Sequence, residues 1–175
     1  MKLAWGSLTL GLAVGFWLLP VNPGESAQSG SGFKASIAGD VMGDVNGPGV
    51  LKYLAPSKSV AGQIPGRYFL ADNQGLRELG VTLSIPESAK VGSYKLVSAS
   101  PLDAGKFFEI RVDRSVGNNV LSYSNETKGE LTLSSFPSKP NKVSGSKVKG
   151  SFKFKTQNNE GKSITVQGKF NFLAK

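Results

Sequence analysis

Cysteine and histidine are both absent from the 175 residues of this chain. Without cysteine, the fold has no disulfide bond and no thiol that could act as a nucleophile. Without histidine, the chain lacks the side chain used most often as a general base and as a metal ligand. We therefore predict a protein that is not an enzyme and that carries no cofactor or metal ion.

Long segments with helical periodicity are also missing, whereas glycine is frequent, with 22 residues. Short alternating runs separated by Gly, Pro, Asn and Ser recur about every ten residues, which is typical of antiparallel sandwiches and barrels. The sequence predicts one all-β domain over residues 30–175. We expect an antiparallel β-sandwich, or a partly closed barrel, of about eight or nine strands.

The longest apolar run, residues 8–19, lies near the N-terminus and is followed by Pro20. A short basic start, an apolar centre and small residues further on are typical of a secretory signal peptide. We predict that residues 1–29 are a signal peptide and that the protein is exported to the periplasm, the cell surface or the medium. An uncleaved anchor is the alternative, since residues 4–21 approach the length that spans a bilayer.

The clearest strand pattern is at the C-terminus. Apolar side chains there occupy even positions: Val148, Phe152, Phe154, Ile164, Val166, Phe170 and Phe172. Alternate side chains of a strand point to opposite faces, so residues 147–173 are predicted to form a hairpin with one buried face and one solvated face. Pairing Phe154 with either Val166 or Ile164 preserves these faces.

Two glycines of this hairpin, Gly150 and Gly168, fall on the predicted inner face, where an aromatic ring could lie over bare backbone. Upstream, we expect a turn at residues 43–49 and a surface loop at residues 55–65. Alternation around Ile110 predicts a solvated ladder of Glu109, Arg111 and Asp113.

Several of these runs together resemble a known group of proteins. The segments are 83–85 (LSI), 92–96 (GSYKL), 129–133 (GELTL), 150–154 (GSFKF), 159–161 (NEG) and 168–172 (GKFNF). From about Gly66 to the C-terminus the chain resembles small exported bacterial β-sandwich domains of uncharacterised function, many of which are surface lipoproteins. The resemblance implies a fold and export but supplies no catalytic residues, and this chain lacks the cysteine that would carry a lipid.

The net charge of +9 is concentrated in the last part of the chain. Residues 139–175 hold nine lysines and one acid, Glu160. The lysines predicted to share the solvated face or to lie beside it are Lys147, Lys149, Lys153, Lys155 and Lys169. Such a face could attract an anionic lipid surface, an acidic polysaccharide or an acidic protein. Alternatively, these lysines only protect an exposed strand from aggregation.

A hydrolase, a calcium site and a ligand carrier would each require features of their own. A hydrolase acting on envelope or extracellular glycans would need two carboxylates, such as Glu109 with Asp113 or Asp40 with Asp44. A calcium loop starting at Asp44 lacks ligands where Pro48 and Ala55 stand, so we predict no metal site. A carrier for small apolar ligands would need a large interior cavity.

We also predict no binding of nucleic acid. Bases would have to stack on exposed rings. The phenylalanines of the C-terminal hairpin share their face with Ile164 and Val166, so we predict that they belong to the core.

Overall fold

The computed structural model describes residues 32–59, 62–72, 79–98, 107–116 and 119–175. This part of the chain consists of β-strands, their connections and one short 3-10 helix, η1 (Pro140–Lys142). No helix within it is long and apolar enough to cross a membrane. The prediction of an all-β fold is confirmed, whereas the predicted signal peptide lies outside the described residues.

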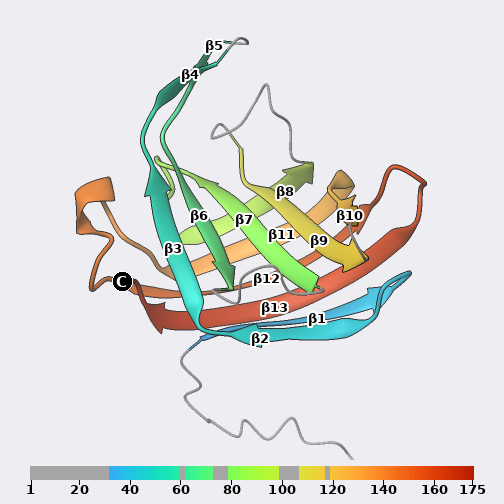
Figure 1. The fold of residues 1–175 in the computed structure, drawn as a ribbon. Helices are drawn as coiled ribbons and strands as arrows, with labels where there is room; N and C mark the ends of the chain where they lie inside the picture. The colour runs from blue at the N-terminus through green and yellow to red at the C-terminus, as the bar shows by residue number, and fades with distance from the viewer. Residues whose placement is uncertain (1–31, 60–61, 73–78, 99–106, 117–118) are drawn as a thin grey trace, which may run out of the picture.

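The strands are, in chain order, β1 (Gly32–Gly39), β2 (Gly43–Gly47), β3 (Gly49–Leu54), β4 (Ser57–Ser59), β5 (Gly62–Ile64), β6 (Arg67–Asp72), β7 (Leu79–Pro86), β8 (Gly92–Ser98), β9 (Glu109–Val116), β10 (Asn119–Tyr123), β11 (Asn125–Ser135), β12 (Lys147–Gln157) and β13 (Ser163–Leu173). The main sheet runs in the order β2-β1-β13-β12-β11-β8-β9-β7-β6-β3, with β10 paired to β9 beside this path. Strands β4 and β5 form a separate ribbon, which projects from the top of the molecule in Figure 1.

The main sheet curls until its two ends approach each other (Figure 1). The end strands β2 and β3 are joined in sequence by Pro48 alone. Proline has no N–H to donate to a strand ladder, so it suits a corner between two strands. Strand β1 pairs with β13 along the whole length of β1, from Gly32 opposite Asn171 to Gly39 opposite Ile164. Of the two predicted architectures, the fold is the partly closed barrel.

Other parts of the predicted architecture are wrong. Strands β8 and β9 pair in parallel through Val97 with Glu109 and Ser98 with Ile110, so the sheet is mixed. The predicted turn at residues 43–49 contains β2 and the start of β3, and the predicted loop at residues 55–65 contains β4 and β5. Gly, Asp and Asn favour turns locally. Pairing with β1, however, holds β2 extended, so tertiary contacts override that preference.

The C-terminal hairpin has the predicted alternation of faces. The seven apolar side chains assigned to the core are buried, and none is more than 7 % exposed. The lysines at odd positions of β12 and β13 are exposed. Phe154 lies opposite Val166, which is one of the two predicted registers.

The phenylalanines of this hairpin lie over glycines of neighbouring strands, as predicted for Gly150 and Gly168. Phe152 is paired with Gly168, and Phe170 with Gly150. A Cβ added to Gly168 would lie 2.4 Å from the Phe152 ring and 2.6 Å from the carbonyl oxygen of Lys34. Phe33 of β1 completes this layer, with its ring centroid 5.6 Å from that of Phe152. These glycines therefore set how closely β1, β13 and β12 can pack.

We predict that Gly168→Ala destabilises the protein by about 1–3 kcal/mol, because the added methyl group overpacks the ring of Phe152 and the backbone of Lys34. Gly80→Ala is the matched control, since no atom lies within 4 Å of its added Cβ. Urea unfolding monitored by circular dichroism measures both free energies. Equal stabilities of the two variants would contradict this account of the core.

Candidate functional site

A groove of about 630 Å³ crosses the outer face of β2, β1, β13 and β12. Its polar lining residues are Lys34, Ser36, Asp44, Asn46, Ser151, Lys153, Gln167 and Lys169. The other four lining residues are Ala35, Val45, Phe152 and Gly168, and the side chains of the first three are buried in the core. The groove therefore has a floor of strand backbone and polar walls.

Strand register arranges the eight polar side chains in two rows across four strands. The first row is Asn46, Lys34, Lys169 and Ser151, and the second is Asp44, Ser36, Gln167 and Lys153. Each residue lies opposite the next one in its row, and the rows are two residues apart along each strand. Since side chains two apart point to the same side, all eight project from one face.

The groove carries unbalanced positive charge, with three lysines against one aspartate, Asp44. Lys34 and Lys169 lie directly opposite each other on β1 and β13. Within the described ranges, the ion pairs are Arg111–Asp113 and Lys162–Glu160, and neither involves a groove lysine. Like charges facing each other across strands are destabilising. An anion in the groove would relieve that repulsion.

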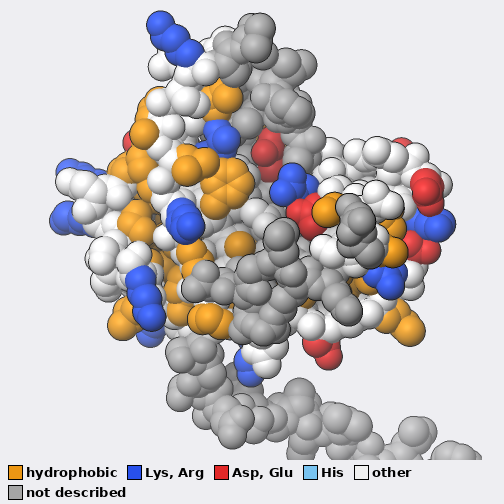
Figure 2. All heavy atoms as spheres, in the orientation of Figure 1, with side chains coloured by type: hydrophobic (Ala, Val, Ile, Leu, Met, Phe, Trp, Pro, Cys, Tyr) orange, Lys and Arg blue, Asp and Glu red, His pale blue; other side chains and the backbone are white. Residues whose placement is uncertain are grey.

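Two of the five predicted lysines, Lys153 and Lys169, line the groove. Lys147, Lys149 and Lys155 are exposed on the same hairpin but do not line it. Figure 2 shows basic side chains spread over another face of the molecule too, so exposure of a lysine alone does not define a site.

The sequence does not predict that Lys34, Asp44 and Asn46 lie beside the lysines of the C-terminal hairpin. Alternation around Phe33 and Ala35 places Lys34 on the outer face of the first strand. Nothing in the local pattern shows that this strand pairs with β13, at the other end of the chain. Asp44 and Asn46 were assigned to a turn, whereas they occupy alternate outward positions of β2.

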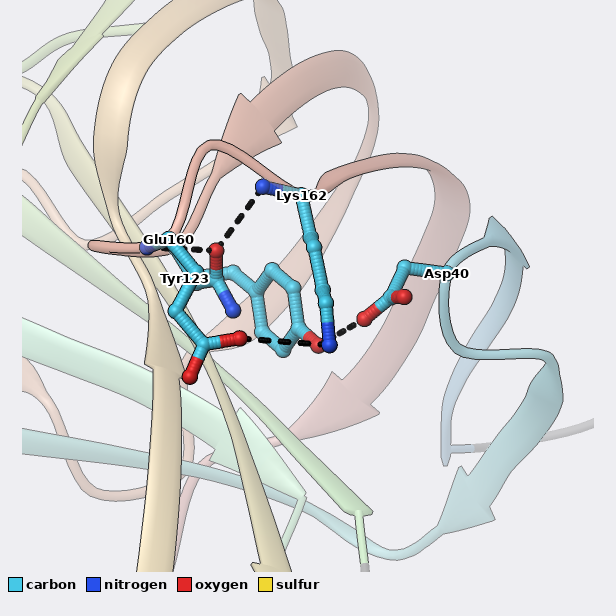
Figure 3. Close-up of polar contacts among 5 residues, drawn as sticks. Asp40, Tyr123, Glu160 and Lys162 are labelled. Carbon is cyan, nitrogen blue, oxygen red and sulfur yellow. Dashed lines mark hydrogen bonds and ion pairs between the residues drawn. The ribbon is translucent and has the colours of Figure 1, made fainter.

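A second polar cluster joins residues that follow β1, end β10 and form the β12–β13 loop (Figure 3). The hydroxyl of Tyr123 donates a hydrogen bond of 2.7 Å to Asp40, which follows β1. In the β12–β13 loop, Lys162 pairs with Glu160 at 3.2 Å, and Asn158 Oδ1 accepts hydrogen bonds from both of their backbone N–H groups. Three separate parts of the chain meet here.

The contacts of Tyr123 are those of a structural tie between parts of the chain. Burial, together with the hydrogen bond to Asp40, raises the pKa of Tyr123 to about 12. A tyrosine nucleophile needs the opposite, because its phenolate must form readily. The neutral hydroxyl of Tyr123 instead holds the β1–β2 connection beside β10.

The carboxylates considered for a hydrolase make separate contacts and do not meet in the groove. Asp40 accepts from Tyr123, whereas Asp44 is the only carboxylate of the groove. Asp113 pairs with Arg111 at 2.8 Å and accepts a hydrogen bond from Ser122 at 2.6 Å. Glu109 is only 6 % exposed, so the prediction that it is solvated is wrong. Glycosidases flank the scissile bond with two carboxylates, and the groove supplies one.

Metal-binding residues do not gather in the described part of the chain, where no three acidic side chains lie close enough to hold an ion. Asp44 and Asn46 would begin a calcium loop, but they lie on the extended strand β2. Such a strand does not wrap its oxygens round a cation as a calcium loop does.

We predict that Tyr123→Phe lowers the free energy of unfolding by about 1–2 kcal/mol at pH 7, because a hydrogen bond to a carboxylate is lost. The wild type should also lose stability as pH rises from about 10, where unfolded tyrosine ionises, towards about 12, where Tyr123 ionises in the folded protein. The variant should lose less over this range. Identical alkaline profiles from urea titrations would contradict this assignment.

A second prediction concerns the facing lysines. Lys169→Gln should raise the free energy of unfolding by about 0.2–1 kcal/mol at low ionic strength, because Lys34 no longer faces a like charge. The gain should shrink in 1 M salt, where the charges are screened. Lys58→Gln, on the separate β4–β5 ribbon, is the control with the same change in net charge. A destabilised Lys169→Gln would mean that Lys169 has a structural role.

No protein-family model, no curated protein and no solved structure matches this chain. The resemblance to exported bacterial β-domains therefore stays a prediction from sequence motifs. The function has to be argued from the site itself.

Proposed function

We propose that this protein is an exported, non-catalytic binding domain of the cell envelope and that its groove holds an anionic partner. One observation carries the proposal: Lys34 and Lys169 face each other without an acidic partner among the described residues. Repulsion of this kind costs stability, and an anionic ligand bound between the two lysines would compensate for it. The polar rows beside these lysines supply hydrogen bonds that could orient such a ligand.

Export is the second part of the proposal. It is supported by the apolar run at residues 8–19 after a basic start. The basic groove would then face the anionic polymers and lipids found outside the cytoplasm.

We predict that the double variant Lys34→Gln/Lys169→Gln binds heparin about tenfold more weakly than the wild type. Each exposed ion pair contributes up to about 1 kcal/mol, and about 1.4 kcal/mol corresponds to a tenfold change in affinity. Wild-type binding should weaken as salt rises, because screening reduces the attraction. Isothermal titration calorimetry at two salt concentrations measures both effects.

The matched control is Lys58→Gln/Lys142→Gln, which removes the same charge from the β4–β5 ribbon and from η1. It should bind heparin nearly as well as the wild type. If both double variants lose affinity equally, the attraction comes from net charge and the groove is not the site. If the wild type binds no polyanion, a structural role without a ligand remains.

A further inference from the structure

We propose that the groove recognises an acidic polysaccharide, a polymer that carries both carboxylates or sulfates and free hydroxyl groups. This inference rests on the proposed function, because it names the class of anion that the groove would hold. It depends on the five polar groups that accompany the three lysines.

Asp44 is the most informative of these groups. A carboxylate accepts hydrogen bonds and donates none, so a ligand that displaces water from the exposed Asp44 must supply a donor in its place. In the described structure Asp44 of β2 lies opposite Ser36 of β1, and no hydrogen bond joins their side chains. A polyphosphate or a polyglutamate backbone presents mainly negative charge to Asp44, which repels it. A saccharide hydroxyl can donate to Asp44 while an acidic group on the same chain meets the lysines.

The neutral residues fit the same ligand. Ser36 and Ser151 can each donate and accept, and Asn46 and Gln167 offer an amide donor beside a carbonyl acceptor. Gln167 stands between Ser36 and Lys153 in its row. A ligand in contact with this row would meet hydroxyl, amide and ammonium groups in succession. A polyhydroxylated chain that also carries charge can satisfy all of them.

The length of the groove favours an extended polymer chain as the ligand. The groove crosses four strands, and Lys34 and Lys153 stand on strands that are two spacings apart, about 10 Å. Its volume of about 630 Å³ is in the range of sites that hold a small organic ligand, about 300–1,000 Å³. A stable protein partner would need roughly 800 Å² of matching surface.

Nucleic acid fits less well. Phe152 is the aromatic residue of the lining, and its side chain is only 3 % exposed, with its ring packed over Gly168. The groove therefore offers no ring on which a base could stack, and single-stranded nucleic acid binding relies on such stacking.

Four probes at equal charge concentration, without divalent cations, test the inference: polygalacturonate, heparin, polyphosphate and vesicles of phosphatidylglycerol. We expect wild-type protein to bind at least one of the two polysaccharides at least tenfold more tightly than polyphosphate or vesicles. Calorimetry or fluorescence anisotropy gives the affinities.

Asp44→Ala supplies the decisive comparison. Asp44 is exposed on an end strand, so the variant should fold, and circular dichroism and urea unfolding check this. Loss of a hydrogen bond to a charged acceptor should weaken binding of the preferred polysaccharide about fivefold or more. The same change should strengthen polyphosphate binding, because a repelling charge is removed.

The outcomes separate the two proposals. If all four probes bind equally and Asp44→Ala strengthens every one, the groove is a general anion site, so the proposed function stands and the polysaccharide inference fails. Preference for vesicles or polyphosphate also overturns the inference. If no probe binds, both proposals fail.

Discussion

The packing of phenylalanine rings over bare glycine backbone is the constraint on which the rest of this structure depends. Phe152 lies opposite Gly168, Phe170 opposite Gly150, and Phe154 opposite Gly129 of the next strand. Each pair matches a large side chain with an absent one, so three adjacent strands fill the same layer without collision. A slip of one residue would expose the rings and place lysines inside. The register of β11, β12 and β13 is fixed in this way.

That fixed register also determines the outer face. Because the inner side chains cannot shift, Lys169 must stand opposite Lys34, and Gln167 opposite Lys153. The groove is thus an array of polar groups anchored on paired strands, and sites built on strands are positioned more precisely than sites on loops. Repulsion between Lys34 and Lys169 offsets a small part of the stability that the core provides, and such losses are common at functional sites.

Local alternation was sufficient to predict the C-terminal hairpin, its buried phenylalanines and the exposure of Lys153 and Lys169. It could not decide between a sandwich and a partly closed barrel, because closure depends on β1 pairing with β13 and on the step through Pro48 between the end strands. The same limit hid Lys34 and Asp44, whose neighbours in space lie far away in sequence. Glu109 shows a different limit. Alternation indicates the face of the sheet to which the Glu109 side chain points. It does not indicate whether that face is covered by other parts of the chain, and Glu109 is buried.

The pairing of the first strand with the last has a consequence for the order of folding. Until β13 has been synthesised, β1 has only the short β2 as a partner, and Phe33 has no rings from the hairpin to pack against. Contacts between the ends of a chain form late, because a long loop must close first. The wall of the barrel on this side therefore cannot close before β13 has emerged from the ribosome. In the exported protein proposed here, that delay would leave β1 without its longer partner during the first part of translocation.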